Sequence, residues 1–105
     1  MNKIEMLQQL VSQNPDNALY HYTLGNEYVK QKQWALAIAP LRQAIQLDPR
    51  FTAAYRELGK ALAATGQTQE AITVYEKGIG VGESTGDLQT VKEIRVFLNR
   101  LLALR

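Results

Sequence analysis

The sequence predicts an all-α fold: a short right-handed solenoid of two helical hairpins, with one flanking helix before them and one after. The stretch LGNEYVKQKQWALAIAPLRQAI, which begins at Leu24, returns in similar form as LGKALAATGQTQEAITVYEKGI at Leu58, 34 positions later. Self-similarity at such a period is the signature of a helical repeat array. Within each stretch the apolar residues recur at spacings of three and four, which is typical of helices, and no run of alternation indicates a strand.

Composition narrows the class of protein. The chain has 105 residues, 46% of them hydrophobic, which suits one compact domain without a large cofactor cavity. The net charge is +2 and no two basic residues are adjacent, which argues against nucleic-acid binding. The absence of cysteine excludes disulfides and thiolate metal sites. Because Glu5 interrupts the apolar residues at the start, we expect no secretory signal. No stretch approaches the ~20 apolar residues that a membrane span needs, so we expect no membrane partner and a cytoplasmic location.

The repeat register assigns each element in order. The apolar residues of the N-terminal segment, Leu7 among them, lie 34 positions before those around Leu41. This segment is therefore predicted to be the second helix of a repeat that lacks its first. The predicted divisions of a single domain over 1–105 are a half-repeat helix at 2–13, a first repeat at 18–51, a second repeat at 52–85 and a capping helix at 86–105.

Small residues mark the turns and the close contacts. Gly66 stands in the break between the two helices of the second repeat, where a left-handed backbone is expected. Lys32 occupies the equivalent place in the first repeat, at a cost of about 1 kcal/mol if its backbone is left-handed. Gly25 and Gly59 share one repeat position, which predicts that two helices approach closely there.

Two segments depart from this regular pattern. The glycines at 78, 80 and 82 do not form a phosphate-binding motif, because Glu83 breaks the spacing and no strand precedes them. They instead predict a soft helix end and a flexible joint before the capping helix. Pro40 removes one helical hydrogen bond, so a kink or a late helix start is expected there.

The repeated residues resemble the tetratricopeptide repeat family, whose motif pairs Leu-Gly with later Tyr, Ala and Pro positions. The first unit supplies His21, Leu24, Gly25, Tyr28, Ala37, Leu41, Ala44 and Pro49. The second supplies Tyr55, Leu58, Gly59, Leu62, Ala71, Tyr75, Gly78 and Glu83. The resemblance covers about residues 18–85; His21 departs from the usual bulky aromatic, and the last two positions of the second unit also differ.

The resemblance implies a non-catalytic adaptor that holds a peptide or a helix of a partner on a concave surface made mainly by the first helices of the repeats. The residues opposite the packed stripe of those helices are Leu19, Tyr22, Asn26, Val29, Lys30, Ala53, Arg56, Lys60, Ala63 and Ala64. Their amide and cationic groups suit a partner with carboxylates, which Arg56 could grip through two parallel hydrogen bonds. The alternative interpretation is that these are ordinary solvated helix residues.

One subfamily clamps the terminal carboxylates of chaperones with two Lys, two Asn and an Arg. Only Asn26 fits that set here. Tyr22 and Glu57 replace the first Lys and the second Asn, and Asp87 and Val91 stand in the remaining cationic positions. We therefore expect no chaperone-tail binding.

No catalytic residue, metal site or cofactor is expected. His21 has no acid or base partner on its helix face, so a packing role is predicted for it. Packing is also the favoured role of Trp34, with a contact to a partner as the alternative. The tail VFLNRLLALR is more apolar than one buried face requires. An oligomeric assembly protein that associates through its terminal helices, with a homodimer as one form, is therefore the alternative function.

Overall fold

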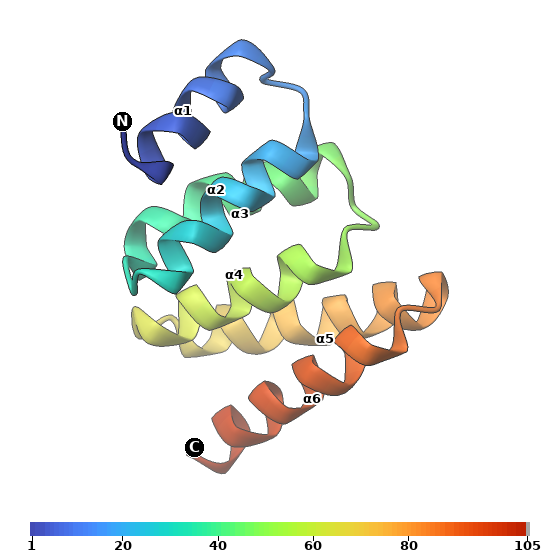
Figure 1. The fold of residues 1–105 in the computed structure, drawn as a ribbon. Coiled ribbons are helices and arrows are strands. Elements are labelled where there is room, and N and C mark those ends of the chain that lie inside the picture. The colour runs from blue at the N-terminus through green and yellow to red at the C-terminus, as the bar shows by residue number, and fades with distance from the viewer. Residues whose placement is uncertain (105) are drawn as a thin grey trace.

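The computed structural model describes residues 1–104, within which the chain forms six α-helices and no strand. They are α1 (Lys3–Gln13), α2 (Ala18–Lys30), α3 (Trp34–Leu47), α4 (Thr52–Ala64), α5 (Thr68–Thr85) and α6 (Leu88–Ala103) (Figure 1). Asn2, Asn17 and Asp87 cap three of these helices, because each side chain accepts a backbone N–H from the first turn. None of the described helices has both the length and the apolar character needed to cross a membrane.

The helices stack in chain order, with α1 at one end and α6 at the other (Figure 1). Each helix packs against the next, and α4 also contacts α2 and α6, so these three helices form one continuous layer. The molecule measures 41 × 28 × 19 Å. The all-α solenoid predicted from the repeat is confirmed, and the layer of α2, α4 and α6 positions the site described below.

The two hairpin turns use the same backbone geometry. Lys32 has φ 58° and Gly66 has φ 82°, so both lie in the left-handed region. In each turn the following amide reaches back to the helix: Gln33 N donates to Tyr28 O and Gln67 N to Leu62 O, both at 2.9 Å. The predicted turn conformation is confirmed, including the less favourable lysine at the first turn.

A glycine at the contact between the two helices of each hairpin lets them approach closely. A Cβ placed on Gly25 would lie 2.5 Å from Leu41 Cγ, and one on Gly59 would lie 2.1 Å from Tyr75 Cε1. Leu24 and Leu58 beside these glycines are 7% and 4% exposed. The prediction that Gly25 and Gly59 permit close contact is therefore confirmed.

The predicted flexible joint at the glycines of residues 78–82 is wrong, since α5 continues through them to Thr85. Two of these glycines are packing positions. A Cβ on Gly78 would lie 2.6 Å from Tyr55 Cβ, and one on Gly82 would lie 2.4 Å from Val91 Cγ2. The helix ends instead at Thr85 and is capped by Gly86, whose φ is 82°. These glycines let α5 lie close to the helices on either side.

The late helix start predicted at Pro40 is also wrong, because α3 begins at Trp34 and includes the proline. Proline leaves the carbonyl of the residue four positions earlier without its helical donor. That residue is Leu36, which is 57% exposed and therefore lies on the solvent side of α3. A missing hydrogen bond on that side costs less than one on the packed side of the helix.

Candidate functional site

A groove of about 490 Å³ crosses the layer formed by α2, α4 and α6. Its position is set by the stacking of these three helices, each of which contributes one face. We use "the groove" for the hollow lined by Asn26, Val29, Lys30, Lys32, Trp34, Arg56, Glu57, Lys60, Glu93 and Phe97. These residues combine cations, carboxylates, an amide and two aromatic rings, which is a set suited to binding a polar polypeptide segment.

The centre of the groove is an ion cluster built around Arg56. Arg56 Nε lies 2.6 Å from Glu57 Oε2, and Arg56 Nη1 lies 2.6 Å from Glu93 Oε1. Lys60 Nζ lies 3.1 Å from Glu57 Oε1. Glu57 is only 3% exposed, so its carboxylate depends on these two cations. The central ion cluster, defined as Arg56, Glu57, Lys60 and Glu93, is therefore neutral overall.

The tyrosine beside this cluster helps to hold the guanidinium. Arg56 Nη2 donates to Tyr22 Oη at 3.4 Å, and the ring of Tyr22 lies 4.6 Å from that of Phe51. Burial raises the pKa of Tyr22, although the Arg56 charge acts against that rise. Burial acts to lower the pKa of Arg56, but the hydrogen bonds and charges of its carboxylate neighbours raise it above its usual value. Arg56 is therefore a fixed cation that its own chain already engages.

The cations at the α2 end of the groove are not engaged in this way. Lys30 is exposed in the last turn of α2, and Lys32 is exposed in the turn that follows. Within residues 1–104, neither forms an ion pair with a carboxylate. Because the central ion cluster is neutral, these two lysines give the groove its positive charge.

A smaller hollow of about 250 Å³ adjoins the groove and shares Trp34, Lys60 and Phe97 with it. We call this hollow the apolar extension; its other residues are Ala63, Tyr75, Arg100, Leu101 and Leu104. The centroid of the Phe97 ring lies 6.3 Å from that of Tyr75 and 5.3 Å from Lys60 Nζ. The site is thus ionic along α4 and becomes apolar toward the C-terminal end of α6.

The structure distributes the ten predicted site residues unevenly. Asn26, Val29, Lys30, Arg56 and Lys60 line the groove, and Ala63 lines the apolar extension. Val29 is only 6% exposed and belongs also to the core. Tyr22 contacts Arg56 from the side, whereas Leu19 and Ala64 are exposed outside both hollows. Ala53 lines a different hollow near Asp48 and Thr85.

Five groove residues were missing from the sequence prediction: Lys32, Trp34, Glu57, Glu93 and Phe97. The sequence does indicate Phe97 as a groove residue, because Phe97 follows Val29 and Ala63 at the repeat spacing of 34 positions. Extending the register into the capping helix identifies Phe97 as a groove residue. Glu93 had no such signal, since its register position in the repeats is the packed glycine of the Leu-Gly pair.

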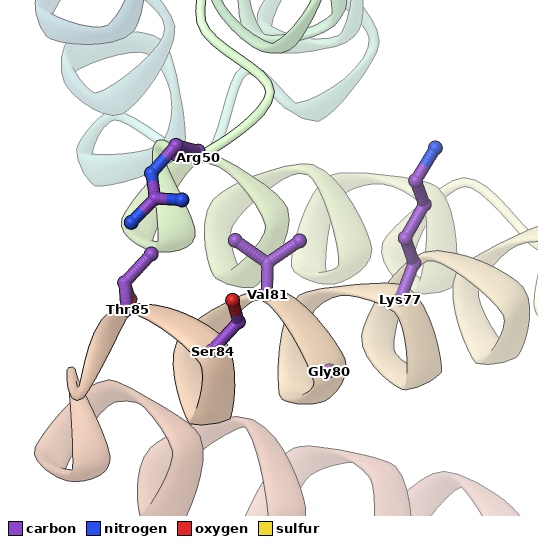
Figure 2. Close-up of a pocket in the computed structure, with 6 residues that line it drawn as sticks. All are labelled: Arg50, Lys77, Gly80, Val81, Ser84 and Thr85. Carbon is purple, nitrogen blue, oxygen red and sulfur yellow. The ribbon is translucent and has the colours of Figure 1, made fainter.

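A separate hollow, of about 400 Å³, lies between α5 and the segment that precedes α4, away from the groove and the apolar extension (Figure 2). Figure 2 shows Arg50 leaning over Thr85, whereas Lys77 extends from the other end of the hollow. Gly80 leaves its rim open, and a Cβ there would meet no atom within 4 Å. Because its two cations do not converge on one point, we take the groove as the candidate site.

His21 has a packing role. Its Nε2 lies 2.8 Å from Pro15 O, and the register-equivalent Tyr55 donates its hydroxyl to Pro49 O at the same distance. Because a carbonyl oxygen only accepts, His21 Nε2 must carry the proton. The two repeats therefore use the same side-chain link to the loop before each first helix. Among the described residues, no group of three His, Asp or Glu side chains is placed to hold a metal ion.

Family models and known proteins match this chain along most of its length. A model described as TPR repeat matches residues 25–66, and one described as Tetratricopeptide repeat matches residues 52–81. The TPR repeat-containing protein PA0015 of Pseudomonas aeruginosa is 34% identical over 98 residues, which cover 93% of each chain.

Solved structures share the fold. The solution structure of protein BPP2914 from Bordetella parapertussis is 37% identical, has a TM-score of 0.84 and is matched over 98% of this chain and 90% of its own. The second TPR domain of human RPAP3, in complex with the HSP70 peptide SGPTIEEVD, is 26% identical with a TM-score of 0.78. That match covers 93% of this chain and 77% of the other.

Proposed function

Because the chain belongs to the tetratricopeptide repeat family, whose members are protein-interaction modules, we propose that it is a non-catalytic cytoplasmic adaptor that holds a segment of a partner protein in the groove. The segment carries carboxylates. A related domain binds a peptide, the HSP70 segment in complex with human RPAP3, which supports a peptide as the class of ligand.

The observation that carries the proposal is the charge of Lys30 and Lys32 at one end of an open groove, where neither lysine has an ion-pair partner among the described residues. Arg56 is already held by Glu57 and Glu93, so the central ion cluster aligns the helices and contributes little net attraction. Exposed lysines that form no ion pair within residues 1–104 can form charge-assisted hydrogen bonds with carboxylates of another chain. The partner segment is therefore expected to lie with its acidic residues at the α2 end.

Charge reversal at these lysines tests the proposal. We expect the immobilised Lys30→Glu plus Lys32→Glu variant to lose proteins that the unchanged chain captures from a lysate of the source organism. The loss should exceed about tenfold, because two attractive contacts become repulsive. The measurement is quantitative mass spectrometry of the captured proteins.

The matched control reverses two lysines outside the groove, Lys77 and Lys92, which are exposed and have no ion-pair partner among the described residues. This variant has the same net charge as the groove variant and should retain the captured proteins. Equal capture by the two variants would contradict the proposal that the partner binds in the groove.

The proposal does not extend to chaperone tails. We expect no micromolar binding of the peptide SGPTIEEVD by isothermal titration calorimetry, with the human RPAP3 domain as the positive control. Glu57 contributes a carboxylate to the middle of the groove, and Tyr22 stands where the clamp-type subfamily has a lysine. Micromolar binding of this peptide would show that a different set of residues forms a clamp here.

A further inference from the structure

The apolar extension is a feature that a purely ionic groove does not explain. It adjoins the groove and shares Trp34, Lys60 and Phe97 with it, and we call the two hollows together the trough. The last turn of α6 supplies Leu101, and the C-cap residue Leu104, which is 83% exposed, follows it. An exposed leucine beside half-buried aromatic rings leaves apolar surface in water, and covering that surface is favourable.

The chemistry of the extension favours an aromatic occupant. Two of its walls are the rings of Trp34 and Phe97, which can stack with or meet the edge of another ring. Two cations stand near these rings: Lys60 Nζ and Arg100 Cζ lie 5.3 and 6.0 Å from the Phe97 centroid. An aromatic ring placed here would offer its electron-rich face to the same cations.

The trough therefore changes in character along its length. Its α2 end has the exposed cations Lys30 and Lys32, its middle has the neutral central ion cluster, and its α6 end is apolar. A second copy of this chain is a poor occupant. Its C-terminal helix carries Arg100, whose charge has the same sign as those of Lys60 and Arg100 that line the extension.

We propose that the apolar extension binds one aromatic side chain of the same partner segment whose carboxylates lie against Lys30 and Lys32. This inference rests on the proposed function and adds a second determinant to it. The partner is a linear segment with a cluster of acidic residues at one end and an aromatic residue toward the other. The opposite ends of the trough also fix the orientation of the bound segment.

The test starts from a phage-displayed library of random twelve-residue peptides selected on the whole protein. We expect the selected peptides to share an acidic pair and an aromatic residue, with affinities measured by isothermal titration calorimetry. Leu104→Ser should weaken the selected peptides about fivefold, because Leu104 contributes apolar contact area. Its exposure means that the substitution should leave the fold intact.

The matched control is Leu88→Ser, at an exposed leucine of α6 that lines neither hollow. This variant should bind like the unchanged protein. Replacing the aromatic residue of a selected peptide with alanine should cost less on the Leu104→Ser variant than on the unchanged protein, because the two changes remove the same contact.

The outcomes separate this inference from the proposed function. Acidic peptides without an aromatic residue, whose binding depends on Lys30 and Lys32 but not on Leu104, would overturn the inference and leave the proposed function standing. Peptides that depend on none of these residues, or a selection without binders, would contradict both. Dimers seen by light scattering that Leu104→Ser dissociates would show that a second copy fills the extension and would also overturn the inference.

Discussion

Gly59→Ala is expected to lower the free energy of unfolding by about 2 kcal/mol, and the melting temperature by about 10 °C. The new Cβ would lie 2.1 Å from Tyr75 Cε1. Tyr75 is 2% exposed and packs among Ile72, Ile94 and Leu98, so any movement of its ring disturbs these contacts. Overpacking of this kind exceeds the gain of about 0.5–1 kcal/mol that alanine brings to a helix interior. Urea unfolding followed by circular dichroism measures the change.

Gly80→Ala provides the matched control, because Gly80 also lies inside a helix but a Cβ there meets nothing within 4 Å. This substitution should raise the free energy of unfolding by about 0.5–1 kcal/mol. Opposite signs for the two glycines would show that packing, and not helix propensity, accounts for Gly59. A neutral or stabilising effect of Gly59→Ala would mean that α4 and α5 are not in close contact.

Arg56→Met should also lower the free energy of unfolding by about 2 kcal/mol. The methionine retains an apolar stem but leaves the buried carboxylate of Glu57 with Lys60 alone. Breaking a buried ion pair on one side costs about 3–5 kcal/mol, and the remaining lysine reduces that cost here. Arg56→Lys should have an intermediate effect, because it keeps the charge without the forked geometry. Both are measured by urea unfolding.

The control for this prediction is Lys30→Met, which removes an exposed cation without an ion-pair partner in the described chain and should change stability by less than about 0.5 kcal/mol. The contrast separates a cation that holds the fold together from one that is free to meet a partner. An equally small effect of Arg56→Met would show that Arg56 is not committed to its own chain.

The repeat register carried most of the fold prediction, because a 34-residue period constrains many positions at once. It placed Leu24 and Leu58 in the core and predicted the left-handed turns at Lys32 and Gly66, all of which the structure confirms. Its failures lie where the pattern stops repeating. The glycines near residue 80 suggested a break, but Gly78 serves close packing between neighbouring helices.

The site was less predictable than the fold for a physical reason. Register gives the face of a helix on which a residue lies, and this was enough to select Asn26, Lys30 and Lys60. It does not give the direction of long side chains across the stack. Arg56 was predicted to be available for a ligand, yet it pairs with Glu57 beside it and with Glu93 on another helix. Such pairing depends on distances between elements that no local pattern encodes.

The most direct test of the groove is an amide chemical-shift map of the protein with a bound partner segment, either a library-selected peptide or a segment of a captured protein. The account predicts that the largest changes fall on α2, α4 and α6, at residues such as Asn26, Lys60 and Phe97. Changes confined to the hollow around Lys77 and Ser84, or to α1, with the groove residues unmoved, would contradict it.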